Sequence, residues 1–184
     1  MQVNDFKQKA VFFDRDGVLN HLVRRDDSFY SPQKFEDFHI VDEAKEVVNL
    51  IKEMGFLTIV VSNQPDISRG KLKQSELDQM TDKLFDTLDI DDVFYCTHDD
   101  DNDIGCRKPA PGLFYTAQKK YNIDLNKSFM IGDTWKDVDA AKKAGISMIL
   151  LDKEYNHKLK GIKRVGTLKK SILAIHSGTI HEKS

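Results

Sequence analysis

Short apolar runs recur along the chain, and each has the length of a single strand. The clearest run is Phe56–Val61 (FLTIVV), in which β-branched residues predominate and favour extended backbone. Four further runs predict strands: Lys9–Asp14, Val93–Cys96, Ser128–Ile131 and Ser147–Leu151. Nearly continuous apolar runs of this kind are typical of strands that are buried on both faces of a parallel sheet.

Segments with helical spacing lie between these runs. In Glu43–Met54 apolar residues return on one helical face, and Gly55 follows as a stop signal. Further helices are predicted from Ser75 to Leu88, from the first-turn proline Pro111 onward, over Val138–Ala144 and near Leu168–Ile175. Strands and helices that alternate in this order predict a doubly wound α/β fold, in which a parallel sheet lies between two layers of helices.

Length and charge narrow the possible functions. The chain has 184 residues, which predicts one domain spanning 1–184. Its 28 Lys and Arg residues nearly balance its 30 Asp and Glu residues, and this balance argues against a nucleic-acid partner held by bulk electrostatics. No apolar run approaches the roughly 20 residues that span a bilayer, and no signal peptide is visible. We therefore expect a monomeric, cytoplasmic protein with no membrane or nucleic-acid partner.

Carboxylates follow two of the predicted strands. The first strand ends in Asp14 and Asp16, and carboxylates two residues apart on extended backbone point in the same direction. Gly17 then allows a sharp turn. Asp133 follows another strand, and Asp137 lies four residues further on. Converging carboxylates repel one another, so this pattern predicts a divalent cation, and Mg²⁺ prefers such ligands.

Polar groups suited to a phosphoryl group follow the other predicted strands. Ser62, Asn63 and Gln64 come after the second strand, and Lys108, preceded by Arg107, adds positive charge. A carboxylate nucleophile, a second carboxylate for proton transfer, a cation and a lysine together predict phosphoryl transfer through an aspartyl-phosphate. Each feature alone has a plainer interpretation, because an Asp-x-Asp pair is often a turn and a Ser-Asn pair is often only a loop.

Four motifs contain these residues: Phe13–Asn20 (FDRDGVLN), Val60–Gln64 (VVSNQ), Cys106–Pro109 (CRKP) and Ile131–Asp137 (IGDTWKD). Together they resemble the motifs of haloacid dehalogenase superfamily phosphatases, over roughly Val11 to Asp152. The resemblance implies that Asp14 is the nucleophile and Asp16 the general acid and base, while Ser62 and Lys108 steady the phosphoryl group. It also implies the Mg²⁺ ligands, which would be Asp14, the backbone carbonyl of Asp16 and Asp133, with Asp137 in support.

Within the superfamily the chain is most similar to the small branch without a cap domain, which includes heptose bisphosphate and histidinol-phosphate phosphatases. Only about two dozen residues separate Asn20 from the first predicted helix, too few for a separate cap. His21–Phe38 is therefore expected to be a loop that overhangs the site. Its Arg24, Arg25 and Tyr30 are candidate substrate contacts, or else belong to a solvated basic loop. The other candidate substrate contacts are Asn63, Gln64 and Arg107.

The resemblance implies Mg²⁺-dependent hydrolysis of a small phosphorylated metabolite, a sugar phosphate such as D-glycero-D-manno-heptose 1,7-bisphosphate at its 7-phosphate. Histidinol phosphate and a nucleic-acid 3′-phosphate end are alternative substrates for the same chemistry. A binding protein without activity would predict loss of Asp14 or Asp16, and both are present. Asp66 stands where relatives of the heptose enzyme usually have a small residue, which weakens the heptose assignment.

The same branch usually carries a zinc loop, Cys-x-His followed by Cys-x-Cys. Cys96, His98 and Cys106 match three of these ligands, but Ile104 occupies the position of the remaining cysteine. Closed structural zinc sites almost always have four protein ligands. One of the aspartates between positions 99 and 103, or water, could complete a Zn²⁺ site. A metal-free loop and two free thiols are the alternatives.

Overall fold

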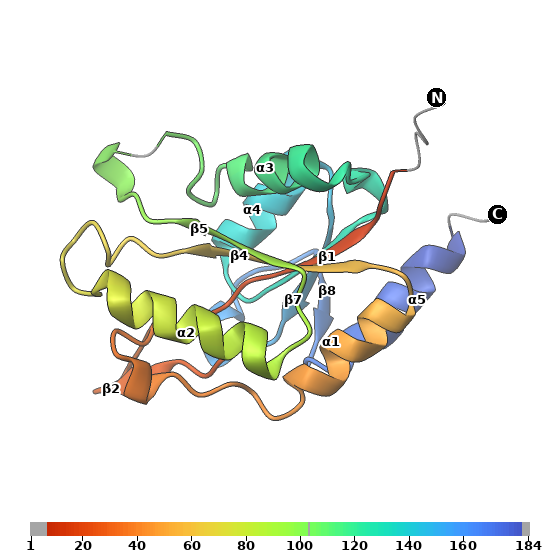
Figure 1. The fold of residues 1–184 in the computed structure, drawn as a ribbon. Coiled ribbons are helices and arrows are strands. Elements are labelled where there is room, and N and C mark those ends of the chain that lie inside the picture. The colour runs from red at the N-terminus through yellow and green to blue at the C-terminus, as the bar shows by residue number, and fades with distance from the viewer. Residues whose placement is uncertain (1–6, 103, 182–184) are drawn as a thin grey trace.

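A central sheet of six parallel strands organises the chain, and the computed structural model describes residues 7–102 and 104–181 (Figure 1). The strands are β1 (Ala10–Phe13), β4 (Leu57–Asn63), β5 (Asp92–Cys96), β6 (Phe129–Gly132), β7 (Ser147–Leu151) and β8 (Lys163–Val165). Their order across the sheet is β5-β4-β1-β6-β7-β8, and each neighbouring pair is parallel. The prediction of a doubly wound α/β fold is confirmed.

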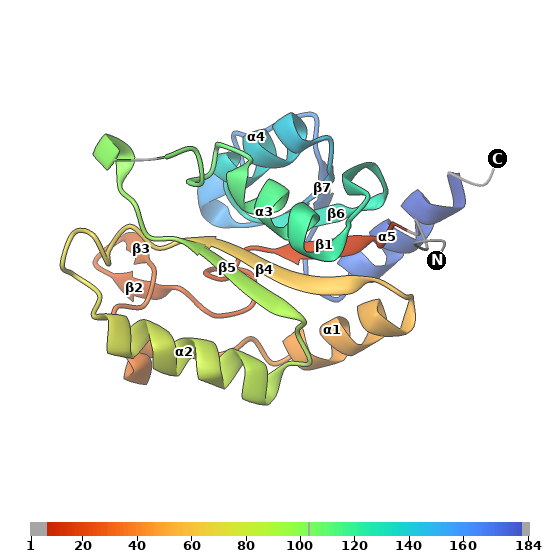
Figure 2. The same cartoon turned by 45° about the horizontal axis from the view of Figure 1, so that its top comes forward.

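Helices cover both faces of the sheet. They are α1 (Ala44–Glu53), α2 (Gln74–Thr87), α3 (Gly112–Tyr121), α4 (Trp135–Ala144) and α5 (Ser171–His181). Figure 2 shows α1 and α2 over one face and α3 and α4 over the other. Within residues 7–102 and 104–181, no helix combines the length and apolarity that crossing a bilayer requires.

Strand β1 is the best buried part of the sheet, and it carries the first motif. Its side chains alternate between two cores, with Val11 and Phe13 facing one and Ala10 and Phe12 facing the other. The Phe12 ring meets the edge of the Phe114 ring from α3, with 5.0 Å between the ring centroids. Full burial of such side chains stabilises the fold by about 1.5–3 kcal/mol each, so the strand gives a rigid base to whatever follows it.

Two helices differ from their predicted bounds by three residues or more, and one strand is additional. Helix α4 begins at Trp135 rather than Val138, because Thr134 and Asp137 form a capping box that starts it earlier. Helix α5 covers Ser171–His181 rather than Leu168–Ile175. Strand β8 is an addition to the predicted strands: two of its three residues are basic, and it pairs only with β7 at the edge of the sheet.

The segment predicted as an overhanging loop is a small hairpin. Strands β2 (Val23–Arg25) and β3 (Ser28–Tyr30) pair in an antiparallel manner, and Asp26 in the turn has a left-handed φ of 50°. Aspartate tolerates this conformation better than most residues, which explains the tight turn. The hairpin and the 3₁₀ turn η1 (Phe35–Asp37) are the elements between β1 and α1, and residues 14–43 contain no separate cap domain, in agreement with the capless prediction.

Candidate active site

Asp14 lies at the carboxyl end of β1 and is nearly buried, at 8% exposed. Its backbone N–H donates to the carbonyl of Ile131 in β6 (2.9 Å), which continues the pairing of β1 with β6 by one residue beyond the strand. Its Oδ1 lies 3.0 Å from Nζ of Lys108, which comes from the loop before α3. The predicted nucleophile is therefore fixed by the sheet on one side and faces a cation on the other.

Lys108 is the buried cation of the site. Its Nζ donates to Asp137 Oδ1 (2.6 Å) and to the carbonyl of Val61 (2.9 Å), in addition to its contact with Asp14. Burial alone would lower the pKa of Lys108, but Asp137 and Asp14 outweigh it and raise the pKa above its ordinary value. The ammonium group is thus charged at every physiological pH.

Asn63 at the end of β4 fixes the backbone of Lys108. Its Nδ2 donates to the carbonyl of Lys108 (2.8 Å), and its Oδ1 accepts from the backbone N–H of Lys108 (2.9 Å). Asn63 also lines the active-site cavity, so its predicted contact with substrate stays open as a prediction. The structure adds a positioning role to it.

Four hydrogen bonds hold the carboxylate of Asp16. Arg15 donates from Nε and Nη2 (3.0 Å each), Asn20 from Nδ2 (3.0 Å) and Gln64 from Nε2 (2.8 Å). The Arg15 side chain is fully buried near the rings of Phe38 and Tyr95. Gln64, predicted as a substrate contact, thus supports Asp16, and it also donates to Ser62 Oγ (3.0 Å).

The chemistry of three carboxylates fits a divalent cation. Asp14, Asp133 and Asp137 each offer an oxygen, and these oxygens lie within 4.8 Å of one another. Burial, opposed by Lys108 and reinforced by Asp137 and Asp16, raises the pKa of Asp14 to about 7. Burial, reinforced by Asp14 and Asp137, raises the pKa of Asp133 to about 8. Oδ1 of Asp133 is buried and has no hydrogen-bond partner within residues 7–102 and 104–181, so it is available to a metal ion.

Asp137 supports the other two carboxylates, because both of its own oxygens are engaged in hydrogen bonds. Its Oδ1 accepts from Lys108, and its Oδ2 accepts from the backbone and hydroxyl of Thr134.

Gly17 leaves space for the side chain of Asp133. A Cβ at position 17 would lie 2.1 Å from Oδ2 of Asp133, and the φ of Gly17 is 86°. A residue with a side chain at position 17 would therefore displace Asp133.

The carboxylates lie in a cavity of about 700 Å³ that also contains Ser62, Asn63 and Lys108. The structure thus brings the predicted catalytic and Mg²⁺-binding residues together. Arg24 does not line this cavity, and its guanidinium is exposed beside Asp27. Tyr30 and Arg25 line a neighbouring hollow of about 500 Å³.

Three further cations, Arg69, Arg107 and Lys136 (the outer cations), line the cavity. Arg107 was predicted to contact substrate; Lys136 lies inside the motif Ile131–Asp137 but was not singled out, and Arg69 lies outside the four motifs. Asp99 accepts from Nε of Arg69 (2.6 Å), and Asp100 accepts from Nε of Arg107 (2.7 Å). Burial, followed by the charge of Arg107, lowers the pKa of Lys136. Because Arg107 and Arg69 both act on Lys136, these three cations form a second positive group in the cavity besides Lys108.

Comparisons with known proteins identify the family of the chain. The family model for haloacid dehalogenase-like hydrolases matches residues 29–145. A D-glycero-beta-D-manno-heptose-1,7-bisphosphate 7-phosphatase of Pasteurella multocida is 36% identical over 157 residues, which cover 79% of this chain and 82% of that one. A D-glycero-alpha-D-manno-heptose-1,7-bisphosphate 7-phosphatase of Photorhabdus laumondii is 35% identical over 80% of this chain and 84% of its own. The chain belongs to the haloacid dehalogenase-like hydrolases. Within this family it is a phosphatase.

The fold of this phosphatase is that of solved relatives. A D,D-heptose 1,7-bisphosphate phosphatase from B. bronchiseptica, crystallised with magnesium and phosphate, matches with a TM-score of 0.80 and 22% identity. The match covers 93% of this chain and 99% of that chain. The agreement extends over almost the whole length of both proteins and includes the absence of a large cap domain.

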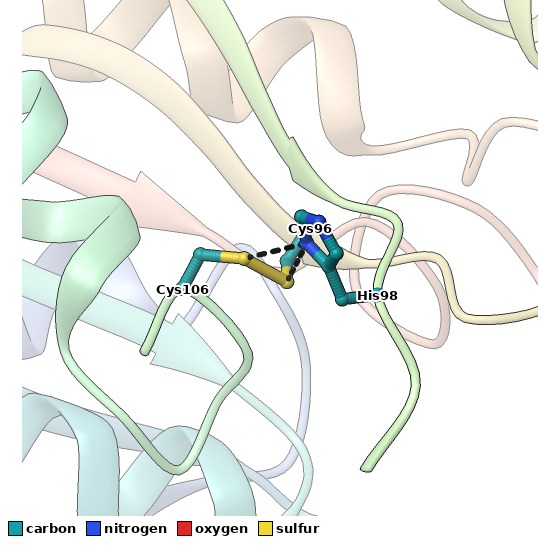
Figure 3. A group of neighbouring side chains, drawn as sticks. All are labelled: Cys96, His98 and Cys106. Carbon is teal, nitrogen blue, oxygen red and sulfur yellow. Dashed lines mark hydrogen bonds between the residues drawn. A yellow bond between two sulfur atoms is a disulfide. The ribbon is translucent and has the colours of Figure 1, made fainter. Parts of the chain in front are cut away.

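The cysteine loop of the phosphatase differs from a zinc site. Cys96 and Cys106 are joined by a disulfide, with Nδ1 of His98 3.4 Å from Sγ of Cys106 and 3.7 Å from Sγ of Cys96 (Figure 3). The alternative of two free thiols is therefore wrong. Because metals bind thiolates, this oxidised form does not support the zinc prediction.

The position of the missing cysteine ligand is turned outward. Ile104 is 79% exposed, although it is a large apolar residue. Two of the aspartates considered as substitutes, Asp99 and Asp100, are engaged by Arg69 and Arg107. Asp103 lies outside the described residues.

Without metal, the phosphatase should lose stability as the pH rises. The folded state raises the pKa of Asp14 to about 7 and of Asp133 to about 8, above the value of about 3.9 in an unfolded chain. Folding then binds protons more tightly, so the metal-free Tm should fall from about pH 4 to about pH 8. Added Mg²⁺ should raise the Tm by more at about pH 8 than at about pH 4.

Thermal melts of the variant Asp133→Asn test this expectation. The variant should show a shallower fall than the parent chain, because one of the two responsible groups no longer titrates. Asp139→Asn, on the exposed face of α4, should keep the parent profile. An Asp133→Asn profile as steep as that of the parent would contradict the assignment.

Proposed function

We propose that this phosphatase hydrolyses a small sugar bisphosphate in a Mg²⁺-dependent reaction, and that the substrate is D-glycero-D-manno-heptose 1,7-bisphosphate, cleaved at the 7-phosphate. The proposal rests on one observation above all: a buried carboxylate, Asp14, lies against a buried ammonium group, Lys108, beside a carboxylate cluster suited to a metal ion. The heptose bisphosphate names of the relatives at 35–36% identity support the substrate.

In the first half of the reaction, an oxygen of Asp14 attacks phosphorus while the bond from phosphorus to the ester oxygen breaks. The proton for the leaving oxygen comes from Asp16. Lys108 neutralises charge on the transferred group, and Ser62 donates its hydroxyl to it. Mg²⁺, when bound by Asp14, the backbone carbonyl of Asp16 and Asp133, with Asp137 in support, supplies further positive charge at this point.

In the second half, water replaces Asp14 on phosphorus. Asp16 takes a proton from the water, the new oxygen–phosphorus bond forms, and the bond from phosphorus to the Asp14 oxygen breaks. Asp16 can serve both steps because the first leaves it ionised, ready to act as a base. Its fixed position between Arg15, Asn20 and Gln64 keeps it within one conformation for both steps.

The outer cations favour a substrate with a second anionic group. Arg69, Arg107 and Lys136 line the same cavity as the Asp14–Lys108 pair. A bisphosphate can place its reacting phosphate at Lys108 and its other phosphate among these cations. Histidinol phosphate has no second phosphate, and a 3′-phosphorylated nucleic acid would need a longer basic track than three residues provide.

We propose that the enzyme acts in the cytoplasm as a monomer. The groups of the proposed mechanism all come from one chain, so the reaction needs no second subunit.

For the cysteine loop, we propose that Zn²⁺ binds only when the disulfide is reduced. Cys96, His98 and Cys106 then offer three ligand atoms within 4.8 Å of one another, and water completes the coordination.

Replacement of the nucleophile gives the first test. Asp14→Asn should lower phosphate release from the heptose bisphosphate by at least about a thousandfold, because an amide does not form the phosphoryl ester. The assay panel should include histidinol phosphate and a 3′-phosphorylated oligonucleotide. Asp139→Asn is the matched control and should leave the rate unchanged. Full activity of Asp14→Asn would refute the mechanism, and preference for another member of the panel would refute the substrate.

The outer cations give a test of the second phosphate. Lys136→Met should raise the KM for the bisphosphate by about tenfold or more, since a charged hydrogen bond contributes about 1.5–3 kcal/mol. The KM for a sugar monophosphate should change little. Lys142→Met, at the exposed far end of the same helix, is the control. Equal changes in KM for both substrates would exclude a separate site for the second phosphate.

The cysteine loop is tested by metal analysis and thiol titration. The oxidised protein should contain neither reactive thiols nor zinc. After reduction and incubation with Zn²⁺, the protein should retain about one zinc per chain, and Cys106→Ser should retain much less, because it lacks one of the three ligands. A reduced chain that retains no zinc would overturn this part of the proposal.

A further inference from the structure

Tyr155 contacts the candidate metal site from a turn that no motif includes. The residue belongs to the 3₁₀ turn η4 (Glu154–Asn156), between β7 and β8. Its hydroxyl donates a hydrogen bond to Oδ2 of Asp133, and its ring lines the active-site cavity. The contact spans 22 residues of sequence. Tyr155 is therefore placed to influence a carboxylate that the proposed mechanism assigns to Mg²⁺.

The turn that carries Tyr155 is itself fixed. Asn156 is buried, and its Nδ2 donates to the carbonyls of Asp133 and Leu151 (2.8 Å each). Its Oδ1 accepts from Nη1 of Arg164 in β8 (2.9 Å). Tyr155 thus holds the carboxylate of Asp133, and the next residue, Asn156, holds the backbone carbonyl of Asp133. A contact made from so rigid a base fixes the orientation of the carboxylate.

This contact leaves the two oxygens of Asp133 with different tasks. Oδ2 is bonded to Tyr155 and lies over Gly17, where no side chain intervenes. Oδ1 is buried and has no hydrogen-bond partner among the described residues. A carboxylate held by one oxygen presents the other oxygen in a fixed direction. Hydrogen bonds to metal ligands generally orient them in this way.

We propose that Tyr155 is a positioning residue for the divalent cation, which it serves by holding Oδ2 of Asp133 so that Oδ1 is free for the metal ion. This inference rests on the proposed Mg²⁺ site. Tyr155 lies outside the four motifs, and it acts on the cation only through Asp133.

Tyr155 also links this carboxylate to the hairpin over the site. The rings of Tyr155 and Phe29 in β3 lie 5.4 Å apart between centroids. Both rings line the active-site cavity and a second hollow of about 500 Å³ next to it, so the ring pair separates the two spaces. A substrate that shifts the hairpin would press on the side chain that orients Asp133. We therefore expect a change in this ring contact to change the affinity for the metal ion.

Mg²⁺ binding to the substrate-free protein tests the proposal without reference to activity. The chain has one tryptophan, Trp135, two positions after Asp133, and its fluorescence reports a Mg²⁺ titration. The rise of Tm with Mg²⁺ concentration gives a second, independent measure of the Mg²⁺ affinity. Tyr155→Phe keeps the ring and removes the hydroxyl, and it should weaken Mg²⁺ binding about tenfold, as loss of a hydrogen bond to a metal ligand does.

The matched control is Tyr115→Phe in α3. Tyr115 is 46% exposed against 41% for Tyr155, and its hydroxyl also donates one hydrogen bond, to the carbonyl of Lys143. This variant should bind Mg²⁺ as the parent does. Phe29→Leu retains the Tyr155 hydroxyl but loosens the ring contact, and it should weaken binding less than Tyr155→Phe.

The outcomes separate this inference from the proposed function. Parent-like Mg²⁺ affinity in Tyr155→Phe overturns the role of Tyr155 and leaves the metal site standing. Parent-like affinity in Phe29→Leu overturns the link to the hairpin. A parent chain that binds no Mg²⁺ overturns the metal site and, with it, the role given to Tyr155. An equal loss in Tyr115→Phe shows a general effect of removing a hydroxyl and also overturns it.

Discussion

The site depends on the contacts of one buried charge, the ammonium group of Lys108. It joins Asp14, the proposed nucleophile after β1, to the carbonyl of Val61 in β4 and to Asp137 in α4. A charge removed from water is costly unless it is paired and fully hydrogen-bonded, and here the three partners satisfy that condition. The cluster has three carboxylates to this one ammonium group, however, so full ionisation would leave an excess of negative charge. Burial first, and then the neighbouring carboxylates, raise the pKa values of Asp14 and Asp133, and a divalent cation would offset both effects.

The strand order explains why these groups meet. From β1 the chain builds outward through β4 to β5, and it then returns to the other side of β1 to build outward again through β6, β7 and β8. In such sheets a crevice forms at the carboxyl ends of the strands where the direction reverses. Asp14 and Asp133 follow the two strands on either side of that reversal. The topology therefore creates the crevice, and the motifs place carboxylates on both of its sides.

The residues that sequence alone could place are those whose position follows from strand ends. Asp14, Asp16 and Asp133 each come directly after an apolar run, and a parallel sheet brings the ends of such runs to one edge. The contact between Gln64 and Asp16 was beyond this reasoning, because it joins side chains 48 residues apart and depends on the turn after β4. Tyr155 gave no signal, since it lies in a turn without periodicity. The cysteine loop was predicted less well, because its pattern is incomplete at Ile104.

The pairing of Asn63 with the backbone of Lys108 has a consequence for the rate of the reaction. An amide side chain that bonds both the N–H and the carbonyl of one residue imitates a neighbouring strand, and it fixes the point from which the lysine side chain starts. A free lysine side chain loses about 1.5–2 kcal/mol of rotamer entropy when it is ordered. Here that loss occurs during folding rather than when substrate arrives. The positive charge is therefore already in place beside Asp14, where the proposed mechanism transfers the phosphoryl group, and such preorganisation lowers the reorganisation needed to reach the transition state.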